Sequence, residues 1–449
     1  MRQLATIGIK SLTPSAIGGY DPKIHDNIFR VTSLRGLAAW WLRAIVSGVA
    51  YDEGDINHDK KATEAQKIIF GATNKSSLLV IRTKLENVKN VNTIGTSLTG
   101  SGENRLSIKH IRLRLLLMGV QDEINTLKDM LKNFDATICV YSSAKKTNLK
   151  EVLGLYAIII SLLLGGLGKG SRRAMGAVKL SPVKLSPEVE KFLQEEECRG
   201  LLQISKGVDE NTLKMIVDDA RKIAGKMLKN GVLGDIKTGK LSSFPKIPSL
   251  SKKAAEIYVK KIERLGGMSR EDRLANLNAD ILEKLFLRSA TDLERLPNRL
   301  QNTKPTQKIV KQRVIRVSEA AALGSYILGL PREARNPPEE HRYRVVFNTT
   351  TTSRKKASPD NVPQRRKQYS GFVKFNDNRE YEHYRRPSPV IVSLLDEQTV
   401  VITLLKSSDW PEELQWFTTH EKEVETLSIN DAYSLVSSYL SSNYQKIWP

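Results

Sequence analysis

The sequence predicts an α+β protein built from more than one domain. Its 449 residues are too many for one ordinary hydrophobic core. Segments in which apolar and polar residues alternate, as in half-buried strands, are interspersed with longer segments of helical period. A third observation concerns the partner and not the fold. The chain has 71 Lys and Arg residues against 49 Asp and Glu, and this net charge of +22 favours a polyanion.

The first part of the chain alternates strands and helices. In chain order we predict a strand at 4–12, a helix from 32, a short helix at 64–70, strands at 78–85 and 111–117, a helix at 122–133, a strand at 136–141, a helix at 152–164 and a strand at 174–180. Thr32 and Ser33 can cap the first helix, and Trp41 lies on its apolar face.

Apart from inserted pieces, this order is βαββαβ, which is that of a ferredoxin-like, or RRM-like, fold. In that fold both helices cover one face of an antiparallel sheet and the other face is open. RNA-recognition modules use such an open face. The strand at 111–117 alternates leucine or isoleucine with basic residues, so one of its faces is basic, although a solvated sheet face would have the same pattern.

The second part of the chain is also α+β and resembles a degraded copy of the first. We predict helices at 210–228, 251–265, 279–287 and 317–328, a strand at 342–348, a long basic loop at 349–386, a hairpin of strands 390–395 and 400–405, and helices at 410–426 and 429–447. The predicted domains are an N-terminal ferredoxin-like domain at 1–185, a linker at 186–200, and a C-terminal helical plus ferredoxin-like domain at 201–449.

Composition favours the cytoplasm and no bound metal or cofactor. The two cysteines, Cys139 and Cys198, are far apart and form no zinc motif, which fits a reducing compartment. The N-terminus enters a strand pattern directly, without the features of a signal peptide. The apolar run 152–168 approaches membrane-spanning length but contains four glycines, so we expect a helix buried against a sheet and no membrane contact.

The segment Gly165–Gly176 carries the clearest chemical signal. Five glycines in twelve residues allow positive φ angles and close approach of a ligand, while Lys169, Arg172 and Arg173 supply positive charge. The order helix, loop, strand excludes a Walker loop and a dinucleotide fingerprint. We therefore expect a phosphate site made by consecutive backbone N–H groups and these cations. A flexible, solvated turn is the alternative.

The first helix offers a second set of candidates. At 100° per residue, Arg35 and Trp40 flank its apolar face and Arg43 lies opposite, so all three can reach a ligand. Trp40 is as well explained by packing against a neighbouring loop as by stacking on a base.

Four segments of the sequence resemble the RAMP superfamily of CRISPR proteins, and within it the family of first subunits of the type III-B Cmr complex. They are Thr13–Asp21, Thr32–Ala44, Gly165–Gly176 and Arg385–Pro389. The resemblance implies RAMP-type ferredoxin-like domains with a glycine-rich loop before the last strand. It also implies a non-catalytic RNA-binding subunit of a Cmr effector in antiviral defence, which contacts the 3′ region of the crRNA guide, the target RNA, or both. The implied partners are these RNAs and other Cmr subunits, including a neighbouring RAMP subunit.

The predicted RNA-binding residues combine the resemblance with the charge pattern. They are Gly18, Gly19, Tyr20, Arg35, Trp40, Trp41, Arg43, Gly165, Gly166, Gly168, Lys169, Gly170, Arg172, Arg173, Gly176, Arg385 and Arg386. The cations would hold phosphates, while Trp40 and Tyr20 would stack on bases.

Two other functions fit the same sequence. A RAMP endoribonuclease would need a histidine beside a 2′-hydroxyl, and His25, His58 and His110 are the candidates, although none lies on the first helix or in the glycine loop. Asp21 or Asp26 could hold a metal, but no further ligands are recognisable. A structural subunit that contacts only acidic proteins would bind RNA without salt dependence.

Overall fold

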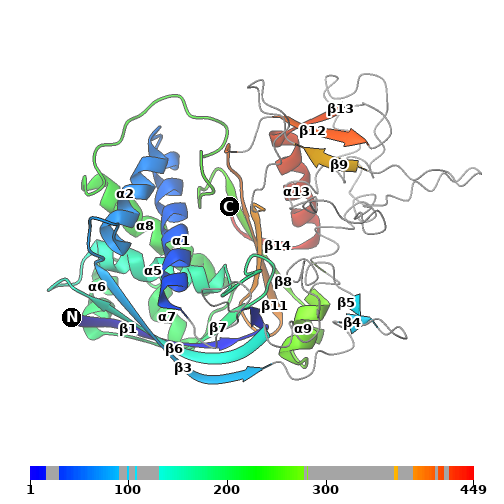
Figure 1. Cartoon of the computed structure of the whole chain (residues 1–449). Coiled ribbons are helices and arrows are strands. Elements are labelled where there is room, and N and C mark those ends of the chain that lie inside the picture. The colour runs from blue at the N-terminus through cyan, green and yellow to red at the C-terminus, as the bar shows by residue number, and fades with distance from the viewer. Residues whose placement is uncertain are drawn as a thin grey trace, which may run out of the picture. The chain divides into compact units, whose positions relative to one another are not determined.

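The structure is a computed structural model that describes residues 1–16, 30–90, 99–100, 107–108, 131–277, 281, 369–372, 388–409, 413–418 and 424–449 (Figure 1). The chain forms two compact units. The first comprises Met1–Ile281, Pro389–Asp409 and Tyr444–Pro449, and the second comprises Leu282–Ser388 and Trp410–Asn443. The first unit contains two larger antiparallel sheets, the short sheet of β4 and β5, and most of the described helices.

The N-terminal sheet has the predicted ferredoxin-like strand order. It contains β1 (Arg2–Ser11), β3 (Leu79–Asn90), β6 (Leu131–Ser142) and β7 (Val178–Leu185), in the order β3-β6-β1-β7 and with every pair antiparallel. The two-residue strand β2 (Ser15–Ala16) also pairs with β6. Helix α1 (Val31–Asp52) connects β1 to β3, and α5 (Leu149–Leu163) connects β6 to β7. The βαββαβ prediction for this half is confirmed.

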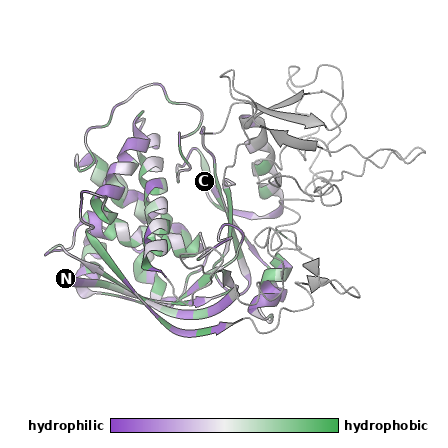
Figure 2. Ribbon diagram, in the orientation of Figure 1, coloured by the Kyte–Doolittle hydropathy of each residue, from purple (hydrophilic) through white to green (hydrophobic). Residues whose placement is uncertain are grey.

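Burial follows the alternation of the strands. On β1 and β6, the side chains of Ile7, Ile9, Ile138 and Val140 are fully buried against the helices. Their immediate neighbours along the two strands are at least partly exposed, with the exception of Gly8. Figure 2 shows this alternation of hydrophobic and hydrophilic residues along the strands. Side chains of a strand point alternately to its two faces, so one face of the sheet builds the core.

The two crossover helices begin differently. Asn148 caps α5 by accepting hydrogen bonds from the N–H groups of Lys150 and Glu151, and Glu151 completes a capping box. α1 begins one residue before Thr32, has Arg30 as its N-cap and makes no side-chain capping hydrogen bond. The predicted cap at Thr32 or Ser33 is therefore wrong, because the residues lie inside the first turn.

α5 is buried from Glu151 to Leu163, as predicted for the apolar run. It packs against α1, against α8 (Glu210–Lys229) and against α2 (His58–Phe70). No described helix of this chain is long and apolar enough to span a bilayer.

The second sheet shows the same strand order. It contains β8 (Ala255–Lys261), β10 (Val390–Leu394), β11 (Thr399–Leu405) and β14 (Gln445–Trp448), in the order β10-β11-β8-β14 and antiparallel throughout. In chain order these strands take positions 4-1-3-2 when read from β14, as the strands of the first sheet do when read from β7. The predicted hairpin is confirmed, and the Asp396 carboxylate accepts hydrogen bonds from the N–H groups of Gln398 and Thr399 in its turn.

Several helix predictions in the second half are wrong. Residues 251–265 contain β8, whose first five residues are all buried, and a short continuous apolar run does not distinguish a central strand from a buried helix. Residues 410–426 contain β12 (Glu413–Thr418) and the start of β13 (Val424–Ser428). The last predicted helix, α13 (Ile429–Asn443), ends before β14.

The predicted linker at 186–200 is wrong as well. These residues form α6 (Pro187–Glu195), capped by the Ser186 hydroxyl, and bury Val189, Leu193 and Cys198 in the core of the first unit. The compact units therefore divide the chain differently from the predicted boundary, because the first unit continues without interruption to Ile281.

The remaining described elements are short. In the first unit they are β4 (Thr99–Gly100) and β5 (Ser107–Ile108), α7 (Gly200–Gln203), the 3-10 turns Ile204–Lys206 and Glu263–Leu265, and α9 (Arg270–Leu277). In the second unit, β13, β12 and β9 (Tyr369–Phe372) form a three-stranded sheet. The predicted elements at 111–117, 317–328 and 342–348, and most of 122–133, 279–287 and 349–386, lie outside the described residues.

A buried ion pair joins the end of α1 to α8 and to the start of the second sheet. Asp52 accepts hydrogen bonds from the Arg221 guanidinium at 2.7 Å, from the Ser251 hydroxyl at 2.5 Å and from the Lys252 N–H at 2.7 Å. The Arg221 guanidinium also lies 5.5 Å from the ring centroid of Trp448, whose indole N–H donates to Asp218. The carboxylate therefore stabilises the joint between the two sheets.

Replacing Asp52 by alanine should destabilise the protein by about 3 kcal/mol, because Arg221, with only 9% of its side chain exposed, loses its ion-pair partner. Urea unfolding measures this loss. Lys191→Ala is the matched control, since it removes a solvent-exposed ion pair with Glu195 and should change the free energy of unfolding by less than about 0.5 kcal/mol. A similar small change for Asp52→Ala would contradict a stabilising role of this pair.

Candidate nucleic-acid interface

The glycine loop is an ordered structure held from two sides. On one side, Lys169 N–H donates to the carbonyl of Ala16 at 2.8 Å and Gly176 N–H to that of Pro14 at 2.9 Å. On the other side, Ala174 N–H donates to the carbonyl of Val392 at 2.9 Å, and Val392 N–H returns a bond to Arg172. The loop thus joins the segment after β1 to strand β10, and the alternative of a flexible turn is excluded for this part of the chain.

Two of the glycines are required by this packing. Gly168 has φ +90° and Gly176 has φ +63°, both in the left-handed region. A Cβ atom at Gly168 would meet the carbonyl oxygen of Ala16, and one at Gly176 would meet that of Leu167. These glycines therefore permit close contacts within the protein itself.

The backbone of the loop is only partly available to an anion. The N–H groups of five loop residues donate to carbonyl oxygens of the protein: Leu167, Lys169, Arg173, Ala174 and Gly176. The expectation that consecutive N–H groups bind phosphate is wrong for these positions. The residues from Lys169 to Arg173 are partly exposed, and the positive charge of their side chains remains the basis for predicting a phosphate site here.

The loop meets α1 through a cation–π contact. The guanidinium of Arg172 lies 4.7 Å from the ring centroid of Trp40. Trp40 is partly exposed and packs edge-to-face on Trp41, with ring centroids 5.0 Å apart. Trp41 is fully buried, so the prediction that it contacts RNA is wrong, and its place on the apolar face explains why. Trp40 and Arg172 together offer an aromatic ring and a positive charge, the two features that suit a nucleobase and its phosphate.

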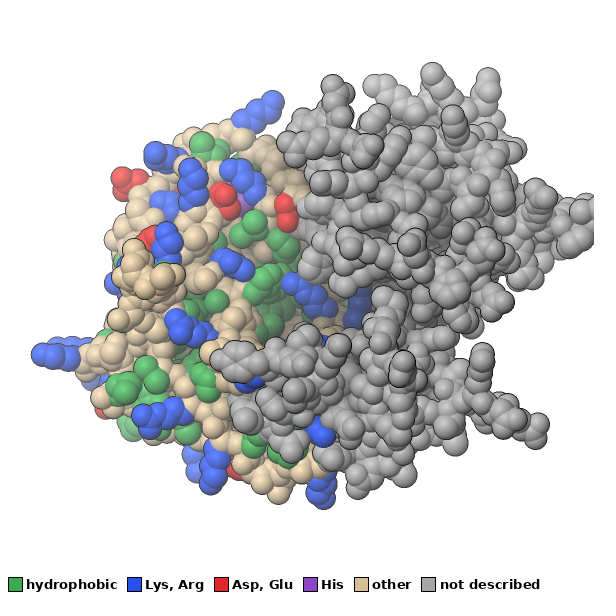
Figure 3. Space-filling model, viewed as in Figure 1, with side chains coloured by type: hydrophobic (Ala, Val, Ile, Leu, Met, Phe, Trp, Pro, Cys, Tyr) green, Lys and Arg blue, Asp and Glu red, His purple; other side chains and the backbone are tan. Residues whose placement is uncertain are grey.

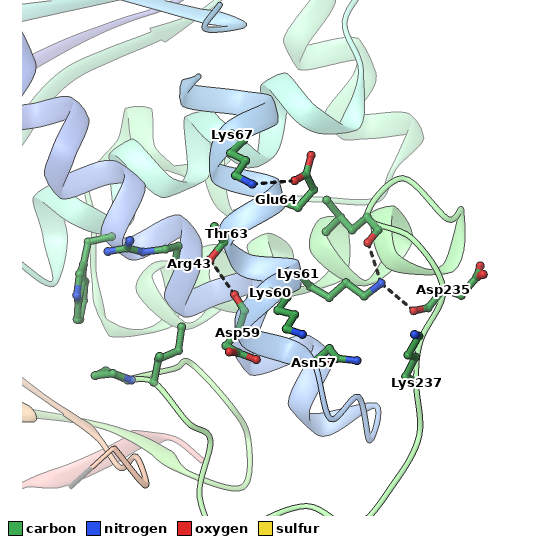
Figure 4. Close-up of a pocket in the computed structure, with 14 residues that line it drawn as sticks. Arg43, Asn57, Asp59, Lys60, Lys61, Thr63, Glu64, Lys67, Asp235 and Lys237 are labelled. Atoms are coloured by element: carbon green, nitrogen blue, oxygen red, sulfur yellow. Dashed lines mark hydrogen bonds and ion pairs between the residues drawn. The ribbon is translucent and has the colours of Figure 1, made fainter. Parts of the chain in front are cut away.

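A pocket of about 800 Å³ begins at this surface (Figure 4). It lies between α1, α2 and the segment 233–248, which follows α8 without regular secondary structure. Its polar and charged lining residues are Arg43, Asn57, Asp59, Lys60, Lys61, Thr63, Glu64, Lys67, Asp235 and Lys237, and Trp40 is its aromatic one. Five of these side chains are cationic and three are anionic, so the pocket has a net positive charge.

The cations of the pocket have different roles. The Lys61 ammonium is nearly buried and donates to the carbonyl oxygens of Leu233 and Asp235, at 2.8 and 2.7 Å. Lys67 pairs with Glu64 at 3.6 Å. Within the described part of the chain, Arg43, Lys60 and Lys237 make no ion pair, so their charge is not neutralised by a carboxylate. Lys and Arg also outnumber Asp and Glu on the face shown in Figure 3.

Arg35 has a structural contact as well as an exposed position. Its guanidinium donates a hydrogen bond to the carbonyl of Phe70, the last residue of α2, and a cation there stabilises the helix C-terminus. Arg35 therefore fixes the N-terminal turn of α1 beside the end of α2.

The structure brings only part of the predicted set together. Trp40, Arg43 and Arg172 form one continuous surface, and Lys169, Gly170 and Arg173 are their neighbours on the loop. Gly165 and Gly166 are buried. Gly18, Gly19, Tyr20, Arg385 and Arg386 lie outside the described residues.

Lys60 and Lys237 are absent from the sequence-based set. The segments that contain these lysines, α2 and the aperiodic segment after α8, carry no sequence motif. The two lysines become neighbours of Trp40 only because both segments fold around α1.

A buried polar cluster supports one wall of the pocket. His58, which is 1% exposed, accepts from the Lys246 N–H at Nε2, so its proton is on Nδ1 and faces the Ser47 hydroxyl at 2.9 Å. Ser249 donates to the same hydroxyl at 2.8 Å. Burial lowers the pKa of His58, and nearby Lys246 acts in the same direction against Asp59 and Asp55. The neutral ring thus anchors residues 246–249 to α1.

Comparison with known proteins identifies the class of fold. Residues 8–179 match the family model of the RAMP superfamily. The match runs from β1 through α1 and the glycine loop into β7, so this part of the chain is similar to RAMP proteins.

The relatives within this class are subunits named Cmr1. The Cmr subunit Cmr1-2 of Pyrococcus furiosus is 22% identical over 188 residues, which cover 40% of this chain and 96% of that protein. The crystal structure of Cmr1 from P. furiosus in the apo form matches with a TM-score of 0.50 and 17% identity, over 99% of this chain and 98% of that one. A chain of the type III-B Cmr-beta complex bound to cognate target RNA matches with a TM-score of 0.51 and 16% identity, over 98% and 99% of the two chains. This chain therefore has the Cmr1 fold.

The His58 cluster should make stability depend on pH. The pKa of His58 is lower in the folded protein than the value of about 6.5 in the unfolded chain, so the unfolded chain binds more protons between these values. The stabilisation is complete above about pH 6.5 and is lost as the pH falls towards the folded pKa.

Urea unfolding between about pH 8 and about pH 5 measures this dependence, and His58→Gln should reduce it. NMR titration of the His58 ring is the direct check. A folded pKa above the ordinary histidine value would contradict the neutral, buried assignment.

Proposed function

We propose that this chain is a non-catalytic RNA-binding subunit of a type III-B CRISPR Cmr effector complex. It contacts the 3′ region of the crRNA guide, the target RNA, or both. The observation that supports this most directly is the stacking of Arg172 on Trp40 at the mouth of a cationic pocket, in a chain with the Cmr1 fold. The net charge of +22 agrees with a polyanionic partner.

The geometry suits single-stranded RNA because such RNA needs two kinds of contact. Its bases stack on aromatic or guanidinium planes, each with a gain of roughly 1–3 kcal/mol, and its phosphates pair with cations. Trp40 and Arg172 supply the first kind, while Arg43, Lys60 and Lys237 supply the second. The pocket therefore extends the interface beyond the residues predicted from the sequence.

The complex supplies the remaining partners. The match to a chain of the Cmr-beta assembly supports a place beside other Cmr subunits. We propose that a RAMP subunit is among these neighbours and that the complex acts in the cytoplasm. The predicted contacts of Gly18, Gly19, Tyr20, Arg385 and Arg386 with RNA remain part of this proposal.

A nuclease function has less support. Acid–base cleavage needs a histidine that can reach a ribose hydroxyl, whereas both ring nitrogens of buried His58 face Ser47 and Lys246. In the ranges that the structure describes, no three His, Cys, Asp or Glu side chains form a group that could hold a metal ion. The other nuclease candidates, His25, His110, Asp21 and Asp26, lie outside these ranges.

Replacing Arg172 and Arg173 by alanine should weaken binding of single-stranded RNA. The salt dependence should become flatter by about 0.7 in the log–log slope for each arginine that contacts a phosphate. Titration of labelled RNA at several salt concentrations measures both effects, and the melting temperature verifies folding. The double variant Lys206→Ala, Lys214→Ala is the charge-matched control, since it removes two exposed lysines, one at the end of the 3-10 turn Ile204–Lys206 and one from the first part of α8, and should leave affinity nearly unchanged. Equal losses in both variants would show only a nonspecific effect of charge.

Trp40→Ala should lower RNA affinity by roughly 1–3 kcal/mol, the value of one stacked base, without changing the salt slope. Trp40→Phe keeps an aromatic ring and should recover part of the loss. If Trp40→Ala binds RNA as tightly as wild type, the tryptophan only packs against Arg172.

The purified chain should leave labelled RNA intact, both with Mg²⁺ and with EDTA. Gel analysis of guide and target RNA over hours measures this. Cleavage that is lost in His25→Ala or Asp21→Ala would support the endoribonuclease instead.

A further inference from the structure

Gly36 has no role in the fold that would explain a glycine at its position. It lies in the interior of α1, five positions after the first residue of the helix, and it is exposed to solvent. A Cβ atom built on Gly36 meets no atom of the described residues within 4 Å, and the φ angle of Gly36 is not positive. Glycine is the least favourable helix residue after proline, so folding alone would favour alanine here.

Two of the other three glycines in the long helices at the core are explained by packing. A Cβ atom at Gly48 would meet the backbone of Leu250 at 2.3 Å, and one at Gly154 would meet the Leu79 side chain at 2.4 Å. In these cases the glycine permits a close approach that the structure contains. Nothing in the described part of this chain makes such an approach at Gly36, so the same reasoning points to another partner there.

The surroundings of Gly36 indicate a polyanion. Trp40 and Arg43 follow Gly36 by four and seven residues, so the three positions lie on one face of α1. Arg35 adjoins this face, and Arg172 covers Trp40. α1 carries no carboxylate before Asp52, its last residue, so nothing on this helix face repels a phosphate.

We propose that the ribose–phosphate backbone of the bound RNA lies directly against α1 at Gly36. From there the strand passes Trp40 and reaches Arg43 and the pocket. This inference rests on the proposed RNA-binding function and adds the path of the strand. The missing side chain lets the strand approach the helix closely enough for a base to reach Trp40 while a phosphate reaches Arg43.

The test compares two glycine-to-alanine substitutions with the same gain in helix propensity. Gly225 lies in α8, and a Cβ atom there meets only Val49, at an ordinary 3.7 Å. Both Gly36→Ala and Gly225→Ala should keep or raise the unfolding midpoint, by roughly 1–4 °C.

RNA binding should separate the two variants. Gly36→Ala should bind single-stranded RNA at least about fivefold more weakly than wild type, since displacing the strand loses much of one stacking contact. Gly36→Gln should lose more, while Gly225→Ala should bind as wild type does.

Each other outcome overturns the inference. If wild type binds RNA and Gly36→Ala binds it equally well, the strand does not pass Gly36. If Gly36→Ala keeps its RNA affinity but no longer joins the Cmr complex, a protein subunit occupies this face instead. If wild type itself does not bind RNA at any salt concentration, the proposed function fails, and this result is distinguishable from the other two.

Discussion

The structure depends on the backbone contacts of the glycine loop. Residues 167–176 donate hydrogen bonds to the segment after β1 on one side and to β10 on the other, so a single loop connects the two sheets of the first unit. Such contacts need main chains to approach without intervening side chains, which Gly168 and Gly176 allow. The loop that looks like a ligand cradle in the sequence is thus first a structural joint.

Function follows from the position that this joint imposes on a few side chains. With the loop backbone fixed, Arg172 lies over Trp40, and α1 brings Trp40 to the edge of the pocket. The His58 cluster holds the opposite wall, and Lys61 holds the segment 233–235. The cationic surface is therefore preorganised before any RNA binds, which lowers the entropic cost of binding.

Much of the N-terminal half could be predicted because its signals are local. The alternation in 4–12, the apolar run of α5 and the glycine loop before β7 each follow from neighbouring residues, and they are sufficient for the βαββαβ order. The second half was harder to predict. β8 is buried on both faces, so its residues do not alternate. The segment 410–426, which contains β12 and the start of β13, has no clear period of two, and its sequence therefore predicts a helix.

The sequence by itself determined the charge, the class of fold and the candidate cations of α1 and the loop, since these are properties of residues and their spacing. Only the tertiary structure decided which of them meet. It buried Trp41, directed Arg35 to the end of α2 and placed Lys60 and Lys237 beside Trp40. The reason is that a pocket is formed by segments far apart in the chain, here α1, α2 and residues 233–248, whose approach depends on packing of the whole core and not on any local pattern.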